Sequence, residues 1–268
     1  MINHLSKTQI GMYQRCPYAY FCRYVEGLKL PPSSSILVGK SFDEAINLEY
    51  NTKIDKKKGQ KVSVIQDCFA DTFDREKDNI VFAENEKPEE LKDLGVKCVA
   101  NFHKEVCPQV NPVMVQKKDE LKFENVDYTF MVVVDVVDDK DIVIDNKTTK
   151  RSWAEGREFQ ELDPIAYSLW YELSQGKQEN KFRFDIGVLT KTPKVQQIER
   201  KVSKEEKKGF LKYIAYIYDS IQYDLKRGMF LPRQDSFLCS KKWCGYYQKC
   251  EKEWGIKIKE GGKTNGAK

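Results

Sequence analysis

The sequence predicts an α/β fold in which helices cover both faces of a central sheet. The main observation is the segment 131–147, MVVVDVVDDKDIVIDNK, where two β-branched runs flank a short polar turn, as in a β-hairpin. Both faces of this hairpin are otherwise apolar, which is typical of strands in the middle of a covered sheet. Helical periodicity at about 62–106 and amphipathic spacing at 205–227 supply candidate covering helices.

Before the hairpin, two local signals define helices. Ser6 and Gln9 form a capping box, which predicts a helix that continues to about Arg15. Pro88 is expected to break the helical region at 62–106, because proline lacks the N–H that a helix interior requires.

After the hairpin, a further helix is expected to begin at Asp163-Pro164. The aspartate is the expected N-cap and the proline suits the first helical position. This helix should continue to about Ser174. Residues 182–189 then read as another strand, and the helix at 205–227 follows it.

The hairpin carries charged side chains that a covered sheet would not normally hold. If the strands pair about Lys140, Asp135 lies opposite Asp145 with the Cβ atoms roughly 5 Å apart, and Lys147 shares their face. A tighter turn at Asp139-Lys140 would leave the carboxylates diagonal. Buried like charges are costly unless a cation binds them, and all-oxygen ligands favour Mg²⁺ or Mn²⁺. The alternative is that both aspartates lie at strand ends in water, with Lys147 as a surface counter-ion.

These residues resemble the core signature of the PD-(D/E)xK nuclease superfamily, namely Asp135 followed by the segment 145–147, DNK, after an apolar strand. The segments 5–18 and 24–28 resemble the start of its RecB-like branch, which includes the AddB nuclease domain and CRISPR-associated and phage exonucleases. The resemblance implies a restriction-endonuclease-like fold: a central mixed β-sheet flanked by helices, with a helical insertion and a C-terminal cysteine staple.

The resemblance also implies roles for individual residues. Asp135, Asp145 and the backbone carbonyl of Asn146 would hold the metal, and the lysine of the signature would orient water or stabilise charge on the phosphate. The segment GKSFD that ends at Asp43 matches a G-x-x-x-H segment that opens a helix. Asp43 stands in place of a metal-binding histidine; it would bind the metal through oxygen or lie on the helix surface. Tyr167 matches a tyrosine that contacts DNA and supports the lysine, with core packing as its alternative role.

The cysteines form a second group. Three of the eight lie close together in the segment 237–250, FLCSKKWCGYYQKC. No signal peptide opens the sequence, so we expect a cytoplasmic protein in which clustered thiols are metal ligands or buried residues rather than disulfides. Cys16, Cys239, Cys244 and Cys250 resemble the four-cysteine iron–sulfur staple of the RecB-like branch, which implies a 4Fe–4S cluster. Zinc on the same sulfurs and a site without metal are the alternatives.

Length and composition fit one domain. The chain has 268 residues, of which 40% are hydrophobic and 32% charged, with a net charge of +5. No apolar run approaches the roughly 18 residues that span a membrane. We expect a single nuclease domain over 1–259 that includes a helical insertion at about 51–110 and the cysteine cluster at 239–250. Residues 260–268 read as a disordered tail.

The resemblance therefore implies a Mg²⁺- or Mn²⁺-dependent deoxyribonuclease. Exonuclease action on single-stranded DNA ends is the leading activity, in recombination, repair, phage or CRISPR-related DNA processing of a bacterium, an archaeon or a phage. A helicase or a recombination or CRISPR complex would be the partner, and no membrane is involved. The alternatives are a catalytically silent DNA-binding or assembly subunit with the same fold, and a structure-specific endonuclease.

Overall fold

The computed structural model describes residues 3–124, 126–236 and 238–256. The chain divides into two compact units. We call residues 31–211 the sheet unit, and residues 1–30 together with 212–268 the terminal unit. The predicted single domain over 1–259 stays a prediction, and the predicted tail at 260–268 lies outside the described residues.

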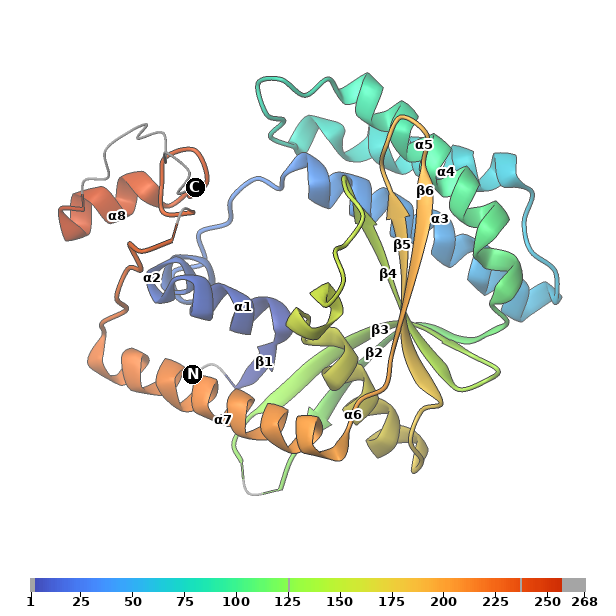
Figure 1. Ribbon diagram of the computed structural model, residues 1–268. Coiled ribbons are helices and arrows are strands. Elements are labelled where there is room, and N and C mark those ends of the chain that lie inside the picture. Colours follow the sequence, from blue (N-terminus) through green and yellow to red (C-terminus); the bar gives the residue numbers. More distant parts are fainter. Residues whose placement is uncertain (1–2, 125, 237, 257–268) are drawn as a thin grey trace. The chain divides into compact units, whose positions relative to one another are not determined.

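The sheet unit is built on a mixed sheet, as the sequence predicts (Figure 1). Its strands follow the order β3-β4-β5-β6, and β2 pairs with β3. The β4–β5 pair is parallel, whereas the β2–β3, β3–β4 and β5–β6 pairs are antiparallel. The strands are β2 (Pro112–Lys122), β3 (Thr129–Asp138), β4 (Ile142–Thr149), β5 (Lys181–Val188) and β6 (Lys194–Arg200).

Strands β3 and β4 form the predicted hairpin. Val136 pairs with Ile144 and Val137 pairs with Val143, so the turn is centred on Lys140. Because the hairpin lies between β2 and β5, both of its strands are interior, which explains their apolar residues on both faces. The two carboxylates of the hairpin occupy the next position of the same register.

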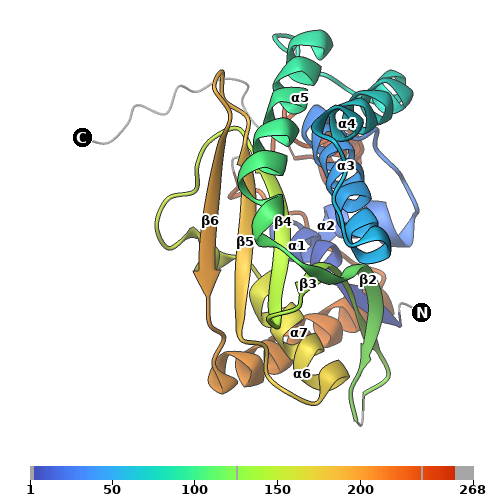
Figure 2. The same ribbon diagram turned by 90° about the vertical axis from the view of Figure 1, so that its right-hand side faces the viewer.

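Helices α3, α4 and α5 lie together beside this sheet (Figure 2). The predicted helical region at 62–106 is confirmed as two helices, and Pro88 begins the second of them. The segment GKSFD does not open a helix as expected; it lies inside α3, which already begins at Ser34. The helices of this unit are α3 (Ser34–Lys56), α4 (Val62–Glu76), α5 (Pro88–Glu105), α6 (Asp163–Gln175) and the first part of α7 (Lys204–Arg227). Short helical turns occur at Lys77–Asn79, Cys107–Gln109 and Arg157–Gln160.

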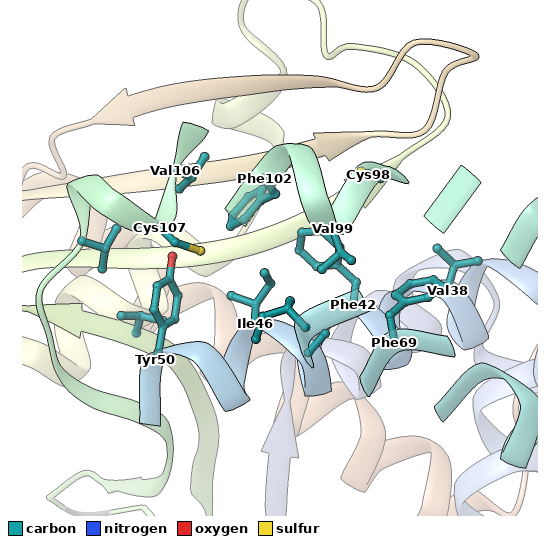
Figure 3. Close-up of a cluster of buried hydrophobic side chains, with 14 of the residues drawn as sticks. Val38, Phe42, Ile46, Tyr50, Phe69, Cys98, Val99, Phe102, Val106 and Cys107 are labelled. Atoms are coloured by element: carbon teal, nitrogen blue, oxygen red, sulfur yellow. The ribbon is translucent and has the colours of Figure 1, made fainter. Parts of the chain in front are cut away.

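The core of the sheet unit lies between these three helices and one face of the sheet (Figure 3). Phe42 of α3 meets Phe102 of α5 edge to face, with ring centroids 4.9 Å apart. On the sheet side, Val136 and Ile144 belong to the same buried cluster. Since side chains alternate along a strand, the next residues of β3 and β4, the two hairpin aspartates, point away from this cluster.

The terminal unit joins both ends of the chain. Its elements are β1 (His4–Ser6), α1 (Lys7–Arg15), α2 (Pro17–Tyr20), a π-helical turn at Phe21–Val25, the second part of α7, and α8 (Tyr247–Trp254). The predicted cap of α1 is confirmed, because the Gln9 N–H donates to Ser6 Oγ at 3.3 Å. Cys22 and Cys250 share a small buried cluster with Tyr18 and Tyr246. In the described part of the chain, no helix combines the length and the apolar character needed to cross a membrane.

The packing of α5 against α4 gives a testable prediction. A Cβ added at Gly95 would overlap Cζ of the buried Phe69 ring, so Gly95→Ala should lower the free energy of unfolding by about 1–3 kcal/mol, the usual cost of overpacking. A Cβ added at Gly209 of α7 would meet nothing within 4 Å, and Gly209→Ala should raise stability by about 0.5–1 kcal/mol through helix propensity. Urea denaturation of both variants checks the difference, and equal effects would contradict this packing.

Candidate active site

The two hairpin aspartates lie side by side on β3 and β4. Asp145 is 1% exposed. Asp135 Oδ2 accepts the backbone N–H of Asn146 at 2.9 Å, which links the two strands beyond their last paired residues. Asp135 Oδ1 accepts Gln116 Nε2 at 3.0 Å. Both carboxylate oxygens of Asp135 therefore accept hydrogen bonds from neighbouring strands.

Lys147 lies on the same face as Asp145, two residues further along β4. Its Nζ is 2.8 Å from Asp145 Oδ1 and 2.6 Å from Oδ2. A second carboxylate, that of Asp163, is 3.7 Å from the same Nζ. Burial opposes the charge on Lys147, but the carboxylates of Asp145, Asp163 and Asp135 raise its pKa above the usual lysine value. The ammonium group is therefore held in its charged form.

Asp43 reaches this group from α3. Burial raises the pKa of Asp43 to about 7, with Lys147 opposing the shift and Asp145 adding to it. Burial likewise raises the pKa of Asp135 to about 6, and the charge of Asp43 contributes to that rise. The fully buried Asp145 has its pKa raised well above the ordinary value by burial and by Asp163 and Asp135. These carboxylates thus raise one another's pKa values in a place with little water.

Tyr167 on α6 borders the same carboxylates. Its hydroxyl donates to the backbone carbonyl of Val133 at 2.5 Å. Burial and the negative charges of Asp145 and Asp163 raise its pKa well above the ordinary tyrosine value. Its ring lies 6.1 Å from that of Phe182 on β5, so Tyr167 also packs in the core. Core packing of Tyr167 is therefore observed, whereas its contact with DNA stays a prediction.

Asp163 is a site residue that the sequence does not reveal as one. The Asp-Pro pair predicts it to be the N-cap of α6, but the N-cap is Leu162, which makes no side-chain cap hydrogen bond. Asp163 is instead the first helical residue, is 3% exposed and lies beside Lys147. The available signal was its spacing of four residues from Tyr167, because residues i and i+4 share a helix face.

Gln116 is a second residue that the sequence did not indicate. Its backbone φ is 48°, a left-handed conformation that side chains other than glycine seldom adopt. Its side-chain amide meets Asp135 across the β2–β3 pair. No local motif marks such a residue, since its role depends on the register between two strands.

Asn146 differs from its neighbours in direction. The backbone N–H of Asn146 donates to Asp135. Because side chains alternate along β4, the side chain of Asn146 faces away from Asp145 and Lys147. It pairs with Asp185 of β5 in the parallel ladder. The predicted ligand role concerns its backbone carbonyl and stays a prediction.

A divalent cation in a protein is held by several oxygen ligands directed at one point. Within residues 3–124, 126–236 and 238–256, no group of three or more histidine, cysteine, aspartate or glutamate side chains is arranged to hold one. In this arrangement N–H donors face the hairpin carboxylates: Lys147 faces Asp145, while Gln116 and Asn146 face Asp135. The donor set itself, buried carboxylates with raised pKa values, fits a hard divalent cation.

The four cysteines of the predicted staple line one small cavity of the terminal unit. All eight cysteines of the chain are free thiols. Burial, then the neighbouring Cys16, Cys239 and Cys244, raise the pKa of the Cys250 thiol to about 12. The structure therefore brings together thiols that are more than two hundred residues apart in the sequence.

The other four cysteines stand apart from this cavity. Cys22, Cys98 and Cys107 are buried, and Cys68 is partly buried against the core of the sheet unit. None of them lines the cavity of the four clustered thiols. Their positions fit core residues, as their isolation in the sequence predicts.

Comparison with known proteins identifies the class of the protein. The sequence profile of the PD-(D/E)XK nuclease superfamily matches residues 4–251, and the chain belongs to this superfamily. Its fold is similar to a crystal structure of a protein from Eubacterium rectale described as a candidate exonuclease, with a TM-score of 0.59 and 11% sequence identity. That match covers 92% of this chain and 88% of the other. No match is found among the curated proteins. Nucleases of this superfamily typically use divalent metal ions such as Mg²⁺ or Mn²⁺.

The raised pKa values predict a pH-dependent stability of the metal-free protein. Asp135 and Asp43 titrate at about 6 and about 7 when folded, against an ordinary value of 3.8. The folded state keeps protons that the unfolded state has released, so stability present below pH 3.8 is lost as the pH rises through 6 and 7. We expect the melting temperature in EDTA to fall from about pH 5 to about pH 8, and Asp43→Asn to reduce that fall. An equal fall of the melting temperature with pH in Asp43→Asn and in the parent would contradict the raised pKa of Asp43.

Proposed function

We propose that this chain is a metal-dependent deoxyribonuclease that hydrolyses phosphodiester bonds, and that its leading activity is exonucleolytic on single-stranded ends. The single observation that carries the proposal is the group formed by the half-buried Asp43 and Asp135, the buried Asp145 and Lys147 in a chain of this superfamily. Buried like charges cost stability unless a cation or a proton relieves them. A divalent cation would offset the repulsion between these carboxylates, and it would also promote hydrolysis of a phosphodiester bound at the same site.

Asp43, Asp135, Asp145 and the backbone carbonyl of Asn146 are the proposed ligands of Mg²⁺ or Mn²⁺. When bound, such an ion polarises the phosphate and lowers the pKa of a water molecule. Aspartate oxygens suit both ions, which explains how Asp43 can replace the histidine found at the corresponding position of related nucleases. For ligation, the N–H donors that now face Asp135 and Asp145 must share these oxygens with the ion.

Lys147 is the proposed electrostatic partner of the reacting phosphate. Its raised pKa keeps it charged, and a fixed positive charge stabilises negative charge that develops during hydrolysis. Asp163 Oδ2 lies 3.7 Å from the ammonium nitrogen and would hold this group if Asp145 bound the metal. The hydrogen bond from the Tyr167 hydroxyl to the Val133 carbonyl would hold α6 in position beside the site.

Two alternatives concern activity. A catalytically silent DNA-binding or assembly subunit would keep the fold, but it would have no need for Asp43, Asp135, Asp145 and Lys147 together. A structure-specific endonuclease would use the same residues. The related structure described as a candidate exonuclease favours action on ends.

A nuclease assay on end-labelled single and double strands, with and without Mn²⁺, tests the function. Asp145→Asn and Lys147→Ala should each lower the cleavage rate by at least about 100-fold, because each removes an electrostatic group of the reaction. Asp163→Asn should lower it less, by about 10-fold, since it acts through Lys147. Asp139→Asn, an exposed carboxylate in the turn of the same hairpin, is the matched control and should retain the parent rate.

Release of single nucleotides from labelled ends is the expected product pattern. Fragments cut internally at a junction would replace the exonuclease by the endonuclease. Absence of cleavage with intact DNA binding would favour the silent subunit, and parent-like cleavage by Asp145→Asn would refute the assigned site.

The cysteines support a second part of the proposal, membership of the RecB-like branch. We assign Cys16, Cys239, Cys244 and Cys250 as ligands of a 4Fe–4S cluster, with zinc as the alternative. Thiolates are the usual ligands of such clusters, and these four line one cavity as free thiols. Each thiolate of a cluster binds a different iron, so the four sulfurs need not converge on one point as they do around zinc. A helicase or a recombination or CRISPR complex in the cytoplasm is the partner that this branch suggests.

Metal analysis tests the assignment. Protein purified without oxygen should be brown and contain about four irons per chain, and Cys250→Ser should lose both the iron and thermal stability. Cys68→Ser, a partly buried thiol outside the cavity, is the matched control and should keep the iron. One zinc per chain in colourless protein would select the alternative, and neither metal with unchanged stability in Cys250→Ser would refute the staple.

A further inference from the structure

We propose that the terminal unit has a pocket for one nucleotide of single-stranded DNA, built around Trp243, Arg15 and Arg233. The proposal rests on the proposed function, because it assigns a DNA contact to residues outside the active site. Its starting point is a cavity of about 180 Å³ lined by all three residues. Helix α1 and residues within 233–236 and 238–246 supply most of the lining.

The lining combines an apolar wall with positive charge. Met12, Leu30 and Leu238 supply apolar surface, while the two arginines supply the charge. A nucleotide has the matching chemistry, since its base is flat and weakly polar and its phosphate is negative. A small apolar ligand would make no ionic contact with the two guanidinium groups. A bare phosphate would make no contact with the apolar wall.

Trp243 is the proposed stacking platform. Its side chain is 60% exposed although it borders this cavity, an unusual position for so large an aromatic residue. Lys242 Nζ lies 5.1 Å from the centre of its ring. Aromatic side chains flanked by cations are the common means by which proteins hold unpaired bases, because every base has a π-face.

The arginines are the proposed phosphate contacts. Arg233 is held in place, since Nη1 donates to the Gln14 carbonyl at 2.9 Å and Nε donates to Asp235 Oδ1 at 2.9 Å. Arg15 is exposed and has no carboxylate partner among the described residues. A planar guanidinium group with free N–H donors suits phosphate oxygens. Asp235 offsets part of the charge of Arg233, so Arg15 should contribute more to phosphate binding.

A base within a single strand fits this pocket better than a base within a duplex. A paired base would have to leave its stack before it could lie on Trp243, at a cost of a few kcal/mol. The cavity is also lined by Cys16, Cys239 and Cys244. The thiol site and the pocket therefore have lining residues in common. Any group that binds these cysteines and orders them also orders this part of the pocket.

Fluorescence anisotropy with a fluorescein-labelled oligothymidylate tests the pocket, using the full chain with Asp145→Asn as the parent so that the strand stays intact. Added Trp243→Ala should weaken binding about 5-fold to 150-fold, the range for loss of one stacking aromatic, and Trp243→Phe should restore most of it. Added Arg15→Ala should reduce the slope of log K against log salt by about 0.7.

Tyr216→Ala and Arg227→Ala are matched controls in the same unit. Tyr216 is an exposed aromatic residue and Arg227 an exposed arginine of α7, and neither lines the cavity. Both variants should bind the oligonucleotide like the parent. Because Trp243 and Arg15 are exposed, their substitutions should leave the melting temperature unchanged.

A strand with abasic sites separates stacking from charge. It should bind the parent and Trp243→Ala equally, whereas Arg15→Ala should still weaken it. Parent-like oligothymidylate binding by Trp243→Ala, or equal weakening of the oligothymidylate and the abasic strand by Trp243→Ala, would overturn the proposal. Cleavage by the chain with native Asp145, combined with parent-like binding by Trp243→Ala, would refute the pocket alone. Loss of binding in Trp243→Ala from a chain that never cleaves DNA would refute the nuclease alone.

Discussion

The ion pair of Asp145 and Lys147 is the interaction on which the candidate site depends. It lies within an interior strand of the sheet, where either charge alone would be expensive to bury. The pair is not balanced by itself, because Asp43, Asp135 and Asp163 bring further negative charge to one ammonium group. The site thus has more carboxylates than ammonium groups, so bound positive charge stabilises it. At low pH, protons on the carboxylates supply that charge.

The architecture around this pair explains how the excess charge is tolerated. The register of β3 on β4 aligns two aspartates, while α3 and α6 each add one carboxylate from outside the sheet. Apolar packing of Phe42, Phe102 and Ile144 in one buried cluster holds α3 in place. The helix contributes both to the core and to the site, because Asp43 follows directly after Phe42.

Much of this arrangement could be predicted from the sequence, and the failures have physical reasons. The hairpin and its register were predictable because β-branched runs and a polar turn are local signals. Strand β6 was not predicted, since its sequence KVQQIER is polar, as an edge strand can be. The sequence predicted a capping role for Asp163, because the pair Asp-Pro is a local signal for the start of a helix. The contact of Asp163 with Lys147 could not be predicted in this way, since it arises only in the folded chain.

The composition of the terminal unit has a consequence for how the chain folds during synthesis. Residues 1–30 pack with residues after 211, so translation of the whole sheet unit separates the two halves. At about 5–20 residues per second, the first half waits roughly 10–40 s for its partner. During that time Cys16 is a thiol without its three neighbours, and the apolar side of α1 has no cover. A ribosome-bound chain would thus have a complete β3–β4 hairpin while its terminal unit is still incomplete.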